Sequence, residues 1–207
     1  MTIALILVEI FTVIMQRNVC EKAFDRKPAG TAVQFMVWAA FYIISNVTTY
    51  FFELPSWLNM VIFSVTFFGV LTWLYEGSIR IKLVLVLFLC LIGMLSEVMV
   101  CFIGILCGID IIHMMGNTEV AIMYTILSKL VWFVEIKIAL LFLKKNKNIV
   151  IRNMDWLEVF IVPVSSVFIV MVMFVPLTDE YVWAKLIASI LILIVNLFTC
   201  LLYTSPS

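Results

Sequence analysis

The chain has 207 residues, of which 65% are hydrophobic and 13% charged, with zero formal net charge and a mean hydropathy of +1.22. Soluble domains are about 45–50% apolar and about 25% charged, and a chain of this length has too little interior to hide so much apolar surface from water. The composition excludes a soluble globular protein. It predicts an all-α, polytopic transmembrane helical bundle.

Seven stretches are apolar enough to form transmembrane helices, since about 20 apolar residues cross about 30 Å of hydrocarbon. In chain order they are residues 2–16, 31–50, 58–75, 83–107, 121–143, 157–176 and 184–204. The first stretch is short for a full crossing, so the sequence predicts six to seven spans.

Basic residues are divided unevenly between the connecting segments. Ten Lys and Arg residues lie in segments 17–30, 76–82 and 144–155, and none lies in the opposite connecting segments 51–57, 108–120 and 177–183. Because Lys and Arg concentrate in cytoplasmic loops, we expect a multi-pass protein whose basic loops and C-terminus are cytoplasmic. Lys185, at the outer start of the last span, is an exception to this pattern.

Two charges interrupt the fourth and fifth spans, Glu97 after Ser96 and Lys129 after Ser128. At 1.5 Å per residue, they lie about 3 Å and about 4–5 Å outside the midpoints of their spans. A lone charge at this depth is costly, so we predict an ion pair between neighbouring helices. The pair could be a structural clasp, a contact that switches when a ligand binds outside, or part of a proton or ion path.

Small residues share the helix face of Glu97 and lie within about 40° of it. They are Cys90, Gly93, Cys101, Gly104 and Gly108. Small residues let helix backbones approach closely in lipid, which predicts that this face packs against the fifth span.

Glu135 points about 120° away from Lys129 and therefore needs a different partner, or else a proton. Asn196 in the last span lies at a similar depth and is our first candidate for a hydrogen-bond donor. Glu9, Ser165 and Ser166 are weaker candidates.

The segment between the fourth and fifth spans is a candidate ligand-facing outer loop. It carries Asp110, Glu119 and the chain's one histidine, His113. His113 could equally be a solvated loop residue with no function.

Catalytic patterns are absent from the sequence. A single histidine and five scattered cysteines provide no catalytic triad and no metal-ligand spacing, and no glycine-rich phosphate loop is present. We expect no enzyme activity, no cofactor, no bound metal and no nucleic-acid partner for this chain.

Three stretches, 74–100, 126–147 and 156–170, together resemble the membrane region of a bacterial sensor histidine kinase. The similar kinases carry a C-terminal GHKL-type ATPase domain and are related to quorum-sensing peptide receptors. The shared pattern contains a glycine–serine–basic turn, two serine–charge pairs, and a proline followed by serines. These residues are Gly77, Ser78, Arg80, Lys82, Ser96, Glu97, Ser128, Lys129 and Pro163.

The resemblance implies that residues 1–204 form a transmembrane sensor domain in the bacterial cell membrane, working as a homodimer. It would detect an extracellular signal, often a peptide in this family, and pass it through the last helix to a cytoplasmic kinase domain. That domain would use ATP and Mg²⁺ and would phosphorylate a response regulator. This chain ends in "YTSPS" where the family continues. We therefore interpret residues 205–207 as a truncation or cloning scar, and expect kinase activity only in a longer parent protein.

Two other functions fit the same residues. A small membrane transporter or channel subunit would use Glu97, Lys129, Glu135 and Asn196 as a polar path. A structural or assembly membrane protein would need no ligand.

Overall fold

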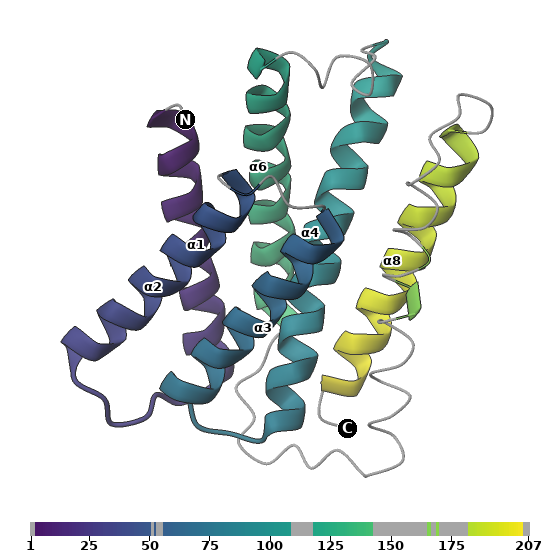
Figure 1. Cartoon of the computed structure of the whole chain (residues 1–207). Coiled ribbons are helices and arrows are strands. Elements are labelled where there is room, and N and C mark those ends of the chain that lie inside the picture. Colours follow the sequence, from purple (N-terminus) through teal and green to yellow (C-terminus); the bar gives the residue numbers. More distant parts are fainter. Residues whose placement is uncertain are drawn as a thin grey trace.

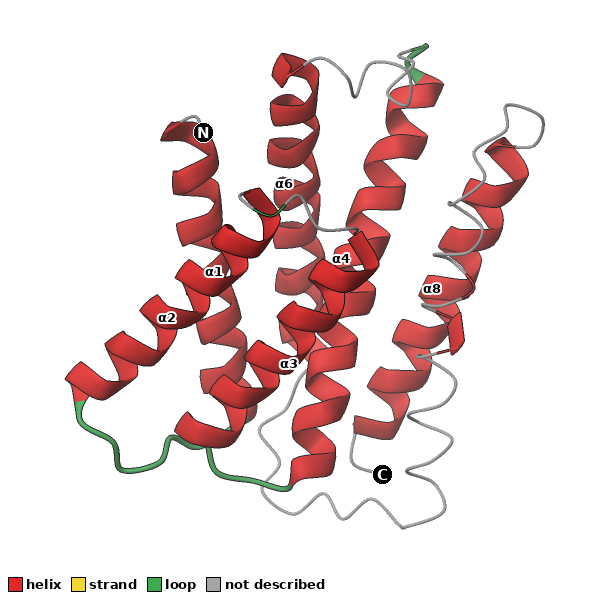
Figure 2. Ribbon diagram, in the orientation of Figure 1, coloured by secondary structure: helices red, strands yellow, loops and turns green. Residues whose placement is uncertain are grey.

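The computed structural model describes residues 3–50, 52, 56–108, 118–142, 165–166, 169 and 182–204. The elements named within this part of the chain are all α-helices (Figures 1 and 2), which confirms the all-α prediction for it. They are α1 (Ile3–Ala23), α2 (Thr31–Tyr50), α3 (Ser56–Leu74), α4 (Ile79–Leu106), α6 (Thr118–Phe142) and α8 (Val182–Thr204). Most of the predicted span 157–176, and residues 205–207, lie outside the described residues.

The ends of α4 follow ordinary capping chemistry. Ser78 has an extended backbone and its side-chain oxygen accepts a hydrogen bond from the Ile81 N–H at 3.4 Å, which satisfies a free donor of the first turn. At the other end Gly108 adopts a φ of +73°, and its N–H donates to the Ile105 carbonyl at 3.0 Å. Gly108 therefore terminates the helix. It does not belong to the helix-packing face for which the sequence suggested it.

Helix α4 is the central element of the bundle. It packs against α3, α6 and α8, whereas α1 packs against α6 and α2. Figure 1 shows α6 between α1 and α4, α8 on the far side of α4, and the α2–α3 pair crossing in front at an oblique angle. Most side chains of α4 between Val84 and Val100 are buried, which accounts for the high hydropathy of this segment.

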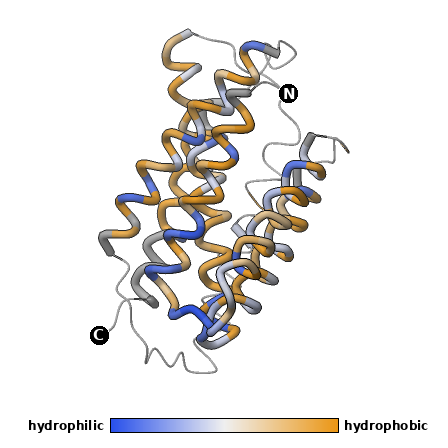
Figure 3. The backbone as a smooth tube through the Cα atoms, turned by 90° about the vertical axis from the view of Figure 1, so that its left-hand side faces the viewer, coloured by the Kyte–Doolittle hydropathy of each residue, from blue (hydrophilic) through white to orange (hydrophobic). Residues whose placement is uncertain are grey.

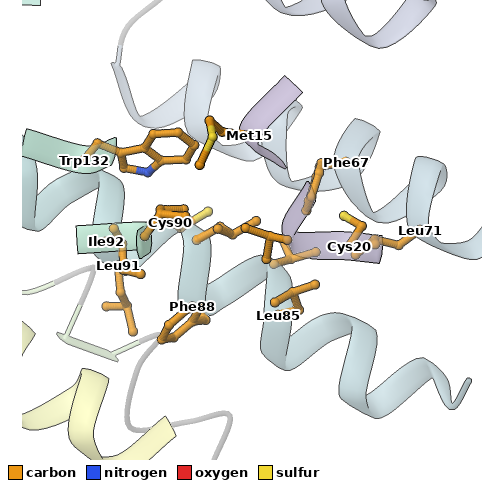
Figure 4. Close-up of a cluster of buried hydrophobic side chains, with 14 of the residues drawn as sticks. Met15, Cys20, Phe67, Leu71, Leu85, Phe88, Cys90, Leu91, Ile92 and Trp132 are labelled. Carbon is orange, nitrogen blue, oxygen red and sulfur yellow. The ribbon is translucent and has the colours of Figure 1, made fainter. Parts of the chain in front are cut away.

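The core is one continuous cluster of apolar side chains from all of these helices. Figure 4 shows its central part, where Met15 and Cys20 of α1 meet Phe67 of α3 and Trp132 of α6 around α4. The α2–α3 pair adds an aromatic group. Its ring centroids lie 5.6–6.3 Å apart, and its members are Trp38, Phe41, Phe63 and Phe67.

The outer surface is also apolar. Every described helix exposes large hydrophobic side chains, for example Phe35 with 72% and Trp73 with 67% of its surface exposed. Figure 3 shows hydrophobic residues along the whole length of the helices. By length and composition, two described helical segments could cross a membrane, Thr31–Thr49 and Ile79–Leu106. Helix α6 is also long, but it carries four charged residues.

At one end of the bundle, the α1–α2 connection is bonded to the α3–α4 connection (Figure 2). The Lys27 N–H donates to the Leu74 carbonyl at 2.9 Å, and the Glu76 N–H donates to the Asp25 carbonyl at 2.9 Å. Two connections that are distant in sequence thus satisfy each other's backbone groups.

Lysines at the same end complete the last turns of helices, where carbonyls have no donor within the helix. Lys27 Nζ donates to the Thr72 carbonyl of α3 at 2.9 Å, and Lys22 donates to the Leu140 carbonyl of α6. Lys82, only 3% exposed, donates to the Tyr75 carbonyl just beyond α3 at 2.7 Å. These residues, which the sequence analysis used as topology signals, therefore also cap helices.

Glu21 lies beyond the predicted span 2–16, where α1 continues to Ala23. The Arg17 Nε donates to its carboxylate at 2.7 Å, and Arg26 also binds this carboxylate. Burial by itself would raise the pKa of Glu21, but the hydrogen bonds and charges of the two arginines outweigh it and hold the pKa below its ordinary value. The α1–α2 connection is thus tied to α1 by charge as well as by backbone bonds.

Gly77→Ala is expected to lower the free energy of unfolding by about 1–2 kcal/mol, because Gly77 has a φ of +113°, which L-residues rarely adopt. A Cβ there would also lie 3.2 Å from the ring of Phe24. Thermal unfolding in detergent measures the change. The control is Gly69→Ala in α3, where no atom lies within 4 Å of the added methyl group. Equal stability of the two variants would contradict this account of the connection.

Candidate functional site

The candidate site is a group of charges in the half of the bundle away from the α1–α2 connection. Lys129 of α6 places its Nζ 3.8 Å from a carboxylate oxygen of Glu9 on α1, with the two side chains 32% and 19% exposed. One turn further along the same interface, the rings of Phe11 and Phe133 lie 5.3 Å apart. The ion pair therefore belongs to a well-packed contact between α1 and α6.

The predicted ion pair between Glu97 and Lys129 is not formed within 4 Å among the described residues; the structure gives Lys129 the carboxylate of Glu9 instead. Glu97 is exposed on α4. The sequence analysis matched the depths of two charges on consecutive helices. Depth does not specify which neighbouring helix a side chain faces, and α1 also borders α6.

Tyr124 makes the direct contact between α6 and the Glu97 position. Its hydroxyl donates to the Glu97 backbone carbonyl at 2.9 Å and lies 3.3 Å from the Cys101 Sγ. The sequence analysis did not include Tyr124. A sequence signal was available, because Tyr124 lies one turn before Ser128 in an otherwise apolar stretch.

The small-residue face of α4 contacts two helices, whereas the sequence predicted one. At its outer end, Cys101 meets Tyr124 of α6; at its inner end, the Cys90 Sγ lies 3.3 Å from the Ser64 Oγ of α3. Gly104 is buried, and no atom lies within 4 Å of the place where a Cβ of Gly93 would be. The face therefore leaves open space next to the Glu97 level.

The serines that precede the two charges are satisfied within their own helices. Ser96 donates to the Gly93 carbonyl at 2.7 Å, and Ser128 donates to the Thr125 carbonyl at 3.0 Å. Ser and Thr hydroxyls often bond the preceding turn in this way, which removes their polarity from an apolar surrounding. The structure gives them no direct contact with Glu97 or Lys129.

Glu135 has both carboxylate oxygens buried and without a hydrogen-bond partner. The expected donor, Asn196, is buried in α8, but its amide donates to the Ile192 carbonyl of its own helix at 2.8 Å. Glu9, the next candidate partner, is next to Lys129. The predicted Glu135–Asn196 hydrogen bond is therefore not formed.

The candidate outer loop is described only in part. Asp110 and His113 lie outside the described residues. Glu119 is exposed in the first turn of α6, so it belongs to a helix and not to a loop. A carboxylate at this position is favourable, since it faces the positive end of the helix dipole.

Within the part of the chain that the structure describes, no cluster of three His, Cys, Asp or Glu residues could hold a metal ion. No protein-family model, curated protein sequence or solved structure matches the chain.

A double-mutant cycle tests the α1–α6 ion pair. Glu9→Gln and Lys129→Met should each destabilise the protein, and their combination should cost less than the sum by about 0.5–3 kcal/mol, as expected for groups in contact. Unfolding in detergent provides the four free energies. The matched cycle of Glu97→Gln with Lys129→Met should show the smaller coupling. A larger coupling energy in the Glu97 cycle than in the Glu9 cycle would show that Glu97 is the main partner of Lys129.

Proposed function

We propose that this chain is a polytopic membrane protein that serves as the input domain of a bacterial sensor histidine kinase. In this proposal it spans the membrane six to seven times, detects an extracellular signal and transmits it through α8 to a cytoplasmic kinase domain. The charge group of Glu9, Lys129 and Glu97 would be the part that responds.

Membrane insertion is supported by the exposed apolar side chains of every described helix. In water such a surface would cause aggregation, because soluble monomers rarely expose apolar patches larger than a few hundred Å². In hydrocarbon the same exposed apolar surface carries no solvation penalty. Polar groups must instead form their hydrogen bonds within the protein. The hydroxyls of Ser96, Ser128 and Ser189 follow this rule by bonding carbonyls of their own helices.

The observation that carries the signalling proposal is the position of the charge group relative to the last helix. Lys129 joins α6 to α1, Tyr124 joins α6 to α4 at Glu97, and α4 packs along α8 (Figure 1). A ligand that changed the charge pairing would alter the α4–α6 contact. Because α8 rests on α4, the change would reach the end of the chain that the family continues into its kinase region.

A two-state packing change is a standard form for such a response. In one state Lys129 would neutralise Glu9, and in the other it would move toward Glu97. The ligand would need a different affinity for the two states, which it could obtain by contacting the exposed Glu97 carboxylate.

A transporter or channel subunit is the second candidate. It is favoured by the partial exposure of Glu9 and Lys129, the exposure of Glu97 and the unpartnered carboxylate of Glu135. Cysteine accessibility scanning along α4 and α6 separates the two functions. A transport path should be labelled from both sides of the membrane, whereas a sensor should be labelled from one.

Labelling of intact cells tests the proposed topology. A membrane-impermeant maleimide should label Cys107, which is exposed just beyond the predicted outer end of α4, and should not label the buried Cys20 or Cys90. The experiment uses a background in which Cys200 is serine. Cys107→Ser should abolish labelling, and Glu76→Cys added to it should be labelled only after permeabilisation. Labelling of Glu76→Cys in intact cells would refute the orientation.

Glu97→Gln tests the signalling role in the complete parent kinase expected from the resemblance. We expect unchanged abundance and a shift in basal autophosphorylation of about fivefold or more, the usual scale of coupling between sites. Glu76→Gln, on the exposed inner connection, is the matched control and should behave as wild type. Loss of abundance with normal activity per molecule would instead make Glu97 a structural residue.

A further inference from the structure

The described apolar segments contain more acidic residues than basic residues at the level of the charge group. Three carboxylates interrupt them, Glu9, Glu97 and Glu135, and the nearest lysines on α6 are Lys129 and Lys137, which lie about 120° and about 160° around the helix from Glu135. Lys137 lies nearer the inner end of α6, where its Nζ sits 5.4 Å from the ring centroid of Phe133. The Lys129 ammonium is paired with Glu9, and neither oxygen of Glu135 has a partner among the described residues.

Glu135 lies at the side of α6 that meets α4. At 100° per residue it falls within about 20° of Tyr124 and Ser128, and Tyr124 bonds the α4 backbone. The residues that face α1 lie elsewhere on the helix, since Lys129 is about 120° and Phe133 about 160° away. Glu135 is therefore placed against apolar neighbours of α4, away from the Glu9–Lys129 pair.

The polar groups of the surrounding helices are engaged with other partners. On α4, Lys82 donates to the Tyr75 carbonyl, Cys90 contacts Ser64, and Glu97 lies nearer the outer end. On α8, the Asn196 amide donates to Ile192 and Lys185 has an interaction of its own. Among the described residues, no cation or donor reaches the two buried oxygens of Glu135.

An ionised carboxylate cannot remain in such a place at moderate cost. Burying an isolated charge without a partner is far more costly than neutralising it, so the group takes up a proton. We propose that Glu135 is a proton-binding site within the α4–α6 interface. A hydronium ion of the aqueous phase donates the proton: one of its O–H bonds breaks as the O–H bond of the carboxylic acid forms, and a neutral water molecule is released. The proposal rests on the membrane insertion proposed above, but not on the signalling role.

The proton has a structural consequence. While Glu135 is neutral, α6 can lie against the apolar side of α4; once it is ionised, the carboxylate must reach water or a cation, and the contact must open. Proton release is thereby linked to the same helix pair that carries Tyr124 and Glu97. A transporter would use this step for proton coupling, and a sensor would use it to respond to acidity.

Infrared difference spectroscopy of the whole protein in lipid vesicles, titrated from neutral to alkaline pH, tests the proposal. We expect the carbonyl band of protonated carboxyl groups at neutral pH, with one component that is lost in Glu135→Gln and retained in Glu9→Gln and Glu97→Gln. Glutamine matches the shape of the neutral acid, so Glu135→Gln should keep the wild-type melting temperature. Retention of the band in Glu135→Gln, or its loss in Glu97→Gln alone, would overturn the assignment.

A second measurement needs no variant. Dicyclohexylcarbodiimide enters lipid and reacts with protonated carboxyl groups, so peptide mapping by mass spectrometry should find Glu135 modified and Glu9 unmodified. Unmodified Glu135 in vesicle-bound protein would refute the proton site and leave membrane insertion intact. Protein that carbonate washing removes from the membrane would refute insertion itself, so the two failures are distinguishable.

Discussion

The constraint on which this structure depends is that polar groups inside an apolar bundle must be satisfied by the protein itself. Buried hydroxyls meet it locally, as when Ser96 and Ser128 donate to carbonyls one turn back in their own helices. Lysines meet it over long distances, and Lys22 reaches from α1 to the last turn of α6. Each such bond fixes one helix end relative to another. The arrangement of the helices therefore depends on which carbonyls these donors bond as much as on apolar packing. Apolar packing alone allows many arrangements, because the helix surfaces have similar hydropathy.

Satisfaction of polar groups differs between the two ends of the described bundle. At the end that carries the α1–α2 and α3–α4 connections, backbone bonds, lysine caps and the Arg17–Glu21–Arg26 group join α1, α3, α4 and α6. In the opposite half Glu97 is exposed, whereas Glu135, which has no hydrogen-bond partner among the described residues, lies in the half of α6 that ends near Leu140 at the bonded end. Regions with few satisfied contacts rearrange at the lowest free-energy cost. In the signalling function proposed above, the response would be centred on the contact of α6 with α1 and α4.

Particular residues show how far sequence reasoning extends. The predicted span 31–50 coincides with α2, and 184–204 lies within α8, because apolar composition and length determine where a helix can form in lipid. The span 2–16 was too short, since α1 continues to Ala23 through polar residues that bond one another at the inner end. Glu9 was considered only as a minor partner for Glu135, although it pairs with Lys129. Position along a helix follows from counting residues, but the direction a side chain faces depends on how neighbouring helices are rotated and ordered.

By itself the sequence determined that this is an apolar, helical chain, where most of its helices run, and which few charges have to be accommodated inside the bundle. These are properties of composition and periodicity, and each is local to one segment. Only the tertiary structure decided which charge meets which. It brought Glu9 to Lys129, Tyr124 to the Glu97 backbone and Cys90 to Ser64, and it left Glu135 alone. The physical reason is that the exposed and the buried faces of these helices are both apolar, so hydropathy does not indicate which face of a helix turns inward, and only the packing of the helices decides it.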